Sequence, residues 1–396
     1  MQMQQVGRYR TPERSANRVW YQKRNKLFDI GMGLDLPFCL LILVLLIIGT
    51  IMMFSASYPI AYYENEDSSF YLKRQAIFAL IGVGIMIAVS FFNYRKLHKL
   101  SVGVLAVSYI SLVVVLIIPS KTDVHRWIGI GNIGIQASEI AKFAVILFLA
   151  HWGSKYFEKM QTLKYGAWPG LIIFVTKAAL LVFEPHYSCI IIMALLTLVM
   201  LYISGIKFKW LAISGIILLV AFVFAASTGL LSYAMKRMDG WGQALTYTEE
   251  NKWDTWQTRN SLYAIGSGGF WGLGLGQSRQ KFLYLPEPQN DFIFAIVCEE
   301  LGLIGAIIIL MIFALLVWRG ITLSLRASDK FGKLLGIGLS AQIGIQVIMN
   351  IFVITDWLPN TGISLPFFSY GGSSLLMLLA QMGIVLSISR TANIEK

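Results

Sequence analysis

The residues best suited to chemistry gather in one segment, residues 229–290, and at the start of the apolar run that follows it. Arg279 and Lys281 are cations that can neutralise phosphate, and Glu287 and Asp291 are carboxylates that can exchange protons. A glycine-rich string precedes them, and glycine lets a backbone approach a ligand closely. The segment is long for a loop and is not of low complexity, so we expect it to be ordered and to hold the chemistry.

Several charged residues also allow a structural interpretation. Spacing alone favours Asp291 as the N-cap of the helix that follows, where it would satisfy free backbone N–H groups. Glu139 and Lys142 are three residues apart in an apolar run, which fits an ion pair within one helix as well as contact with substrate. Lys177 and Glu184 lie in or near a short apolar run and could face an interior cavity or reach the membrane surface.

Motifs for other chemistries lack their context. The string Gly129–Gly134 matches GxGxxG, but no strand and helix flank it as a dinucleotide site requires, so we interpret it as a tight turn. The cysteines and histidines show no spacing typical of a disulfide framework or a metal site, and we expect no metal ligand set. Trp127 fits an interfacial anchor as well as a residue that packs on a substrate.

The elements that position these residues are apolar helices. The chain is 56% hydrophobic and only 14% charged, with a mean hydropathy of +0.65, which is typical of a membrane protein. Its net charge of +12 does not form one basic stripe, so we expect no nucleic-acid partner. We predict an all-α, polytopic bundle of about ten transmembrane helices with one large extracytoplasmic loop.

Apolar windows place the predicted spans, and the positions of Lys and Arg orient them. The spans lie near residues 36–57, 74–92, 101–119, 137–152, 168–184, 187–204, 208–228, 291–318, 332–355 and 365–389. Basic residues concentrate in the N-terminal tail, in alternate loops and at the C-terminus, so we expect both termini in the cytoplasm. The predicted organisation is a cytoplasmic basic tail (1–35), a transmembrane domain (36–390) containing the loop at about 229–290, and a second cytoplasmic tail (391–396).

Five strings taken together resemble the SEDS family (shape, elongation, division and sporulation), to which FtsW, RodA and SpoVE belong. They are His125–Ile128, Ile135–Lys142, Leu285–Phe294, Glu299–Gly302 and Thr361–Ser374. The resemblance covers essentially the whole chain after the tail, and it is stronger to the division and sporulation branch than to RodA. It implies a ten-helix peptidoglycan glycosyltransferase of the bacterial plasma membrane that polymerises lipid II on the outer face.

The resemblance also implies partners and a mechanism. The expected partners are a class B penicillin-binding protein, lipid II, membrane lipid, and proteins of the divisome or of sporulation. Asp291 matches the family's essential carboxylate and would act as the general base on the acceptor sugar hydroxyl. That hydroxyl would attack the anomeric carbon of the growing glycan with inversion and displace undecaprenyl pyrophosphate.

Because a pyrophosphate leaves as a stable anion, cations replace the acid that a glycosidase needs. We assign this work to Arg126, with Arg279 and Lys281 as further candidates. A divalent cation, Mg²⁺ or Mn²⁺, could share it, although no ligand motif specifies one.

The remaining candidates would contact or surround the substrate. Glu287 would position a ligand or the loop, and Trp127 would pack on a sugar or an isoprenoid. The others are Glu139 and Lys142 on the wall of a groove for the lipid tail, Gln257 and Ser261 in a partly matching family string, and Ser373 in the string that lets the last helix pack closely.

One string departs from the family pattern, and two other functions stay open. Where the family usually has Gln/Glu-Pro-Asp-Leu-Gly, this chain has His186 and Ser188 in place of Asp and Gly. A lipid II flippase would place its polar residues near the middle of the membrane, with Lys142, Lys177 and Glu184 along the path. A non-catalytic scaffold for a penicillin-binding protein would not need Asp291. We favour the polymerase because the polar residues concentrate in the exterior loop.

Overall fold

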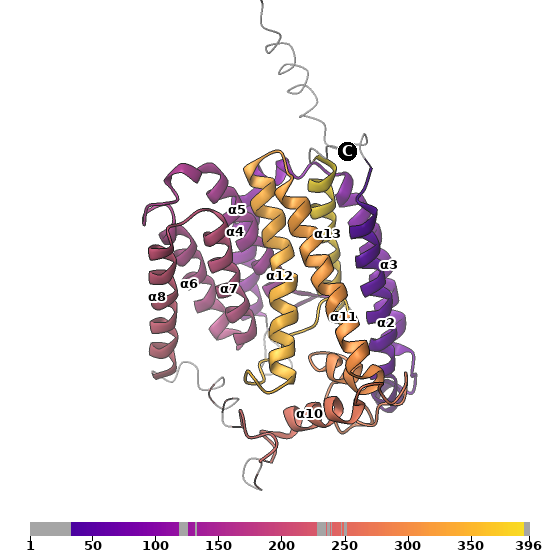
Figure 1. Ribbon diagram of the computed structural model, residues 1–396. Coiled ribbons are helices and arrows are strands. Elements are labelled where there is room, and N and C mark those ends of the chain that lie inside the picture. Colours follow the sequence, from indigo (N-terminus) through magenta and orange to yellow (C-terminus); the bar gives the residue numbers. More distant parts are fainter. Residues whose placement is uncertain are drawn as a thin grey trace, which may run out of the picture.

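In the computed structural model the long helices run side by side, and a short helix, α10 (Trp256–Gly268), lies across one end of the bundle (Figure 1). The structure describes residues 33–118, 126–130, 133–227, 240–246 and 252–391, together with residues 235, 238 and 248. Most of the predicted tails, residues 1–32 and 392–396, lie outside the described residues. So do His125, the tip of the Gly129–Gly134 string and parts of the loop at 229–290.

Ten helices of the described chain overlap the ten predicted spans. They are α2 (Leu36–Asn65), α3 (Phe70–Phe91), α4 (Arg95–Ile117), α5 (Ala137–Lys155), α6 (Ala167–Phe183), α7 (Tyr187–Ile203), α8 (Phe208–Ser227), α11 (Ile293–Leu325), α12 (Lys330–Ile354) and α13 (Gly372–Thr391). Within the described residues, α2, α3, α4, α11, α12 and α13 are long and apolar enough to cross a membrane, and α6, α7 and α8 are apolar but shorter. Helix α5 is in neither group and carries Glu139 and Lys142.

Among the six long apolar helices of the described chain, α12 and α13 are the most deeply buried. The apolar windows of α12 and α13 are 61% and 72% buried, whereas those of α2, α3, α4 and α11 are 28–39% buried. The outer helices expose large aliphatic side chains, among them Leu80, Ile110 and Ile307. An apolar outer surface around a buried interior is what a lipid environment stabilises, and this all-α membrane architecture agrees with the prediction.

The predicted start of the last helix is wrong by several residues. This helix begins at Gly372 rather than at residue 365, because residues 365–371 form turns in which Ser369 Oγ accepts a hydrogen bond from the backbone N–H of Leu365 at 2.7 Å. Phe367 in this stretch has a φ of +66°, which a helix does not allow. The first helix begins at Leu36 as predicted, and the Asp35 side chain accepts a hydrogen bond from Phe38 N.

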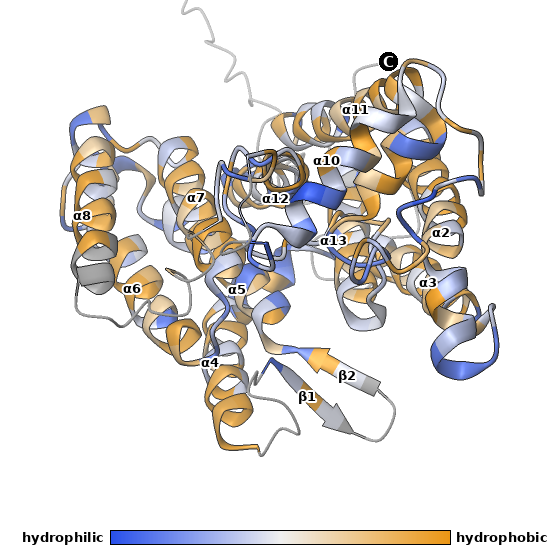
Figure 2. Ribbon diagram, turned by 90° about the horizontal axis from the view of Figure 1, so that it is seen from below, coloured by the Kyte–Doolittle hydropathy of each residue, from blue (hydrophilic) through white to orange (hydrophobic). Residues whose placement is uncertain are grey.

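A short antiparallel hairpin precedes α5. Strands β1 (Trp127–Ile130) and β2 (Ile133–Gln136) pair Trp127 with Gln136, and the hairpin lies at the side of the bundle near α4 (Figure 2). The GxGxxG string therefore lies in a hairpin and not in a βαβ unit, which agrees with its interpretation as a turn.

Helix α11 is interrupted near its N-terminal end. Gly302 has a φ of +67° and a ψ of −171°, so residues before and after it belong to two helical pieces. A side chain at this position would place its Cβ 2.3 Å from the backbone nitrogen of Gly272, so only glycine fits. The interruption lets the loop after α10 pack into the helix.

Candidate active site

A cavity of about 670 Å³ opens among the ends of several helices. Its lining includes seven of the residues that the sequence proposed as a site: Arg126, Trp127, Glu139, Lys142, Glu287, Asp291 and Ser373. They come from the hairpin, from α5, from the segment before α11 and from α13. Residues from distant parts of the chain therefore meet at one place.

The N-termini of four helices point positive backbone dipoles toward this cavity. Gln136, His186, Asp291 and Gly371 line it, and each lies next to the first turn of α5, α7, α11 or α13. The free N–H groups at helix N-termini favour anions, and a helix end of this kind is a common phosphate site. The cavity is therefore suited to a negatively charged ligand.

Asp291 is held through its backbone. Its carbonyl oxygen accepts a hydrogen bond from Asn350 Nδ2 at 2.8 Å, and the same amide donates to the carbonyl oxygen of Ile363 at 2.6 Å. Phe292 occupies the N-cap position of α11, and it makes no side-chain cap hydrogen bond. Asp291 thus lies one residue before the cap position, contrary to the interpretation of this residue as the N-cap.

The carboxylate of Asp291 lies against Gly362. A Cβ atom at position 362 would be 2.8 Å from Asp291 Oδ2, and Gly362 has a φ of +70°. The neighbouring Thr361 carbonyl oxygen accepts a hydrogen bond from Ser188 Oγ on α7. The segment of residues 361–362 therefore connects the N-terminus of α7 with the candidate base.

Lys142 and Arg126 are two of the three described Lys and Arg residues that line the same cavity. Lys142 Nζ lies 2.7 Å from Glu139 Oε1, so the predicted ion pair is formed while both residues line the cavity. Arg126 Nη2 donates to the carbonyl oxygen of Pro185 at 2.6 Å, which fixes the guanidinium at the turn between α6 and α7. Charge-assisted contacts of this kind pre-position cations for a phosphate.

The cavity also contains residues that the sequence did not propose as a site. Arg74 reaches it from α3, Gln346 from α12, and Asn290 from the segment before α11. His186 and Ser188, noted in the sequence only as departures from a family string, line it as well. The one sequence signal for Arg74 was its charge at the end of an apolar run. An uncharged amide such as Gln346 gives no such signal.

Comparison with known proteins adds the decisive observation. The FtsW, RodA and SpoVE family model, described as cell cycle protein, matches residues 36–394. This chain belongs to the FtsW/RodA/SpoVE family. Stage V sporulation protein E of Bacillus subtilis (strain 168) is 40% identical over 360 residues, covering 90% of this chain and 97% of that protein. A probable peptidoglycan glycosyltransferase FtsW of Trichlorobacter lovleyi is 35% identical over 359 residues, covering 90% and 93%.

Solved structures share the fold of this family member. One chain of a peptidoglycan synthase complex matches with a TM-score of 0.72 at 20% identity, covering 92% of this chain and 100% of that chain. The rod shape determining protein RodA of Thermus thermophilus matches with a TM-score of 0.66 at 23% identity, covering 92% and 99%. At these identities the likeness establishes the helical membrane architecture.

Four proposed site residues of this family member lie outside the cavity lining. Ser261 is buried and donates to the carbonyl oxygen of Ile354 at 2.9 Å, which ties α10 to α12. Gln257 accepts a hydrogen bond from Asn360 Nδ2 at 2.6 Å and braces the loop. The side chain of Arg279 is exposed, while its backbone N–H donates to Glu299 Oε1 at 2.9 Å.

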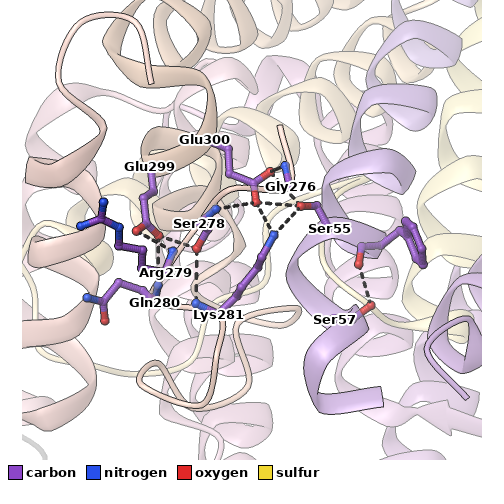
Figure 3. A network of polar contacts seen from close by, with 10 residues as sticks. Ser55, Ser57, Gly276, Ser278, Arg279, Gln280, Lys281, Glu299 and Glu300 are labelled. Carbon is purple, nitrogen blue, oxygen red and sulfur yellow. Dashed lines mark hydrogen bonds and ion pairs between the residues drawn. The ribbon is translucent and has the colours of Figure 1, made fainter. Parts of the chain in front are cut away.

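Lys281 is the fourth of these residues, and it is fully buried. Its Nζ lies 2.8 Å from Glu300 Oε1 and 3.2 Å from Ser55 Oγ, and both of these partners are buried (Figure 3). An ammonium that is enclosed in this way does not reach the cavity, so the structure places Lys281 in the support of the loop instead of at a phosphate.

The neighbouring Glu299 and Glu300 organise the loop around Lys281. Glu300 accepts hydrogen bonds from the backbone N–H groups of Gly276 and Ser278, and Glu299 accepts from Arg279 N and Ser278 Oγ (Figure 3). Both carboxylates lie just before the interruption of α11, so the loop that leads to Asp291 is fixed to that helix.

Proposed function

We propose that this chain is a peptidoglycan glycosyltransferase that polymerises lipid II on the outer face of the plasma membrane. The observation that carries the proposal is the cavity in which the Asp291 carboxylate lies together with Arg126 and Lys142 among four helix N-termini. One carboxylate and several anion-binding groups are what an inverting transfer with a diphosphate leaving group requires. The similarity to a probable peptidoglycan glycosyltransferase FtsW supports the same activity.

Each group would have a distinct role in the reaction. Asp291 would remove the proton from the acceptor sugar hydroxyl, whose oxygen then attacks the anomeric carbon on the face opposite the diphosphate. The bond from that carbon to the diphosphate oxygen breaks, and undecaprenyl pyrophosphate leaves with the electron pair. Arg126 and Lys142 would neutralise the charge that develops on the leaving oxygen, and helix dipoles would add to this effect.

Glu287 and Trp127 would shape the acceptor and lipid sides of the site. Asn290 Nδ2 donates to Glu287 Oε2 at 2.7 Å, so Glu287 supports the turn that carries Asp291. Trp127 is 47% exposed at the edge of the cavity, where an aromatic face can pack on a sugar or an isoprenoid. The described residues bring together no three His, Cys, Asp or Glu side chains that could hold a metal ion.

The proposed orientation in the membrane follows from the distribution of basic residues. With basic residues retained inside, both termini would lie in the cytoplasm and the cavity would face outward. A class B penicillin-binding protein would be the partner that crosslinks the new strands, and division or sporulation proteins would recruit the pair. Similarity to stage V sporulation protein E and to FtsW supports this setting.

The decisive experiment compares glycan polymerisation by wild type and Asp291→Asn, purified with the partner and supplied with labelled lipid II. We expect wild type to make long strands and the variant to lose about 10²–10⁴-fold in rate, which is the usual contribution of a general base. Asp67→Asn is a matched control, because Asp67 lies between α2 and α3 and is not part of the cavity lining.

Other outcomes would point to other functions. A folded Asp291→Asn protein that polymerises at the wild-type rate would contradict the general-base role. Movement of lipid II across vesicles, with no polymer from either protein, would support the flippase. Recruitment of the partner without any lipid II chemistry would support the scaffold.

A further inference from the structure

The turn between α6 and α7 supplies the cavity with a histidine that the mechanism above does not use. His186 lines the cavity, is only 8% exposed, and has an Nδ1 atom without a hydrogen-bond partner in the described part of the chain. A buried polar atom without a partner is unfavourable unless a ligand or water provides one. The position of His186 in the cavity makes a bound ligand the natural provider.

Positive charge surrounds this imidazole. Arg126 donates a hydrogen bond to the carbonyl oxygen of Pro185, the residue before His186, and Lys142 lines the cavity from α5. Burial first, and then these two cations, hold the pKa of His186 well below its usual range. Glu184 lies on the same turn, and the other titratable groups of the lining are Arg74, Glu139, Cys189, Glu287, Asp291 and Tyr370. Burial and the two cations therefore disfavour the imidazolium form of His186.

We propose that His186 is a proton-linked contact for the diphosphate of the lipid-linked donor, and that it takes up one proton when this anion binds beside Arg126 and Lys142. The inference rests on the proposed function, because that function is what brings a diphosphate into the cavity. Two negative charges near the ring favour the imidazolium form, and the imidazolium then donates a charge-assisted hydrogen bond to a phosphate oxygen.

The charges of the reaction explain why a further cation is useful. A diphosphate joined to a sugar and a lipid carries two negative charges, and it gains a third when the bond to the sugar breaks. Arg74, Arg126 and Lys142 bring positive charge to the lining, and the carboxylates of Glu139, Glu287 and Asp291 offset part of it. Protonated His186 adds positive charge where negative charge develops on the departing oxygen.

The proton balance is closed without any co-reactant. The proton on His186 comes from solvent when the donor binds and returns to solvent when the diphosphate leaves. The hydroxyl proton of the acceptor passes separately to Asp291. The electron pair of the broken bond stays on the diphosphate oxygen, and the new bond forms from the acceptor oxygen.

The test measures lipid II binding and avoids turnover. Fluorescent lipid II is titrated at about pH 6 to 8.5 into Asp291→Asn protein and into the double variant Asp291→Asn/His186→Asn, both in detergent with the partner bound. We expect the dissociation constant of the protein that retains His186 to rise with pH, by up to about tenfold per unit when one proton is linked. The double variant should show a correspondingly flatter pH dependence.

A matched control uses a histidine near the opposite end of α5. His151 also has an Nδ1 atom without a hydrogen-bond partner among the described residues, but its ring lies against that of His98, tilted by 51° at a centroid distance of 4.2 Å, and it does not line the cavity. Asp291→Asn/His151→Asn should keep the full pH dependence. Titration calorimetry in two buffers of different ionisation enthalpy provides a measurement that needs no change at position 186. It should detect proton uptake on binding to the Asp291→Asn protein.

The outcomes separate this inference from the function on which it rests. Equal pH dependence with and without His186, or no proton uptake in the calorimeter, would overturn the role of His186 while leaving the polymerase intact. Failure of lipid II to bind to any of the proteins would instead count against the proposed function itself.

Discussion

A carboxylate can act as the base for one particular hydroxyl only if its backbone and its oxygen atoms are both fixed in position. For Asp291, Asn350 fixes the backbone carbonyl, while Gly362 lies against Oδ2. Ser369 Oγ donates to the carbonyl oxygen of the preceding residue, Asn290, at 2.6 Å. At the residue scale, therefore, the site depends on small and amide side chains that surround one acid.

Gly362→Ala tests this arrangement. The new Cβ would lie 2.8 Å from Asp291 Oδ2 and would also strain a backbone with a φ of +70°. We expect the carboxylate to shift and polymerisation to fall by roughly 10²-fold, because a displacement of about 1 Å can have that effect. The assay is lipid II polymerisation, with circular dichroism to confirm the fold.

Gly242→Ala is the matched control for backbone strain. Gly242 has a φ of +72° with nothing within 4 Å of an added Cβ, so it carries the strain without the clash. If both variants lose the same activity, the contact between Gly362 and the carboxylate has no special role.

At the scale of elements, the interruption of α11 joins the loop to the bundle. The free backbone groups around Gly302 pair with the loop, as in Leu303 N to Gly269 O and Leu273 N to Glu299 O, both at 2.9 Å. The buried carboxylates of Glu299 and Glu300 then hold the next part of the loop, and Ser55 of α2 contacts Glu300 at 2.7 Å. Helix α11 thus holds the part of the loop from Gly269 to Lys281, which leads toward Asp291.

Lys281→Met tests whether Lys281 supports the loop or binds substrate. Removing the ammonium leaves the buried Glu300 carboxylate without its counter-ion, and breaking a buried ion pair usually costs about 3–5 kcal/mol of stability. We therefore expect a marked fall in the unfolding temperature in detergent. Lys281→Met/Glu300→Gln should recover much of the loss, because it removes both charges of the pair.

Arg279→Met is the control for charge alone, since the Arg279 side chain is exposed. It should leave the unfolding temperature unchanged. A Lys281→Met protein of wild-type stability that has lost lipid II binding would return Lys281 to the role of a phosphate ligand.

At the scale of the whole molecule, the site lies where distant helix ends converge. Five segments lie at the end of the bundle that carries α10 (Figures 1 and 2). They are the connection between α2 and α3, the hairpin, the turn between α6 and α7, and the segments before α11 and before α13. The connection between α5 and α6 lies at the other end. The proposed activity requires the first of these ends to face outward.

Accessibility of single cysteines tests this orientation. Asn65 and Gln161 are exposed amide residues at opposite ends of the bundle, and each can be changed to Cys in a background without Cys39, Cys189 and Cys298. We expect an impermeant maleimide to label Asn65→Cys but not Gln161→Cys in intact cells, because basic loops stay inside. Permeabilised cells should label both, and the reverse pattern in intact cells would refute the outward-facing cavity.

Composition and hydropathy were enough to predict the helical membrane architecture, whereas the candidate base and its main cation came from the resemblance to the SEDS family. Long apolar runs leave the backbone few choices in lipid other than helices, so the ten spans could be located from the sequence. Glu139 and Lys142 could be proposed because charged residues within an apolar run are costly and stand out. The roles of Asp291 and Arg126 came from the resemblance to the SEDS family, since spacing alone favoured an N-cap for Asp291.

Which of these residues share a cavity depended on the packing of the helices. Lys281 and Arg279 carry the right charge for phosphate, but Glu299 and Glu300 hold their loop against α11, a pairing that depends on the interruption at Gly302. His186 lines the cavity for a similar reason, because the packing of α6 and α7 determines where the turn between them lies. Local sequence records the type of each side chain, whereas its neighbours depend on contacts between segments far apart in the chain.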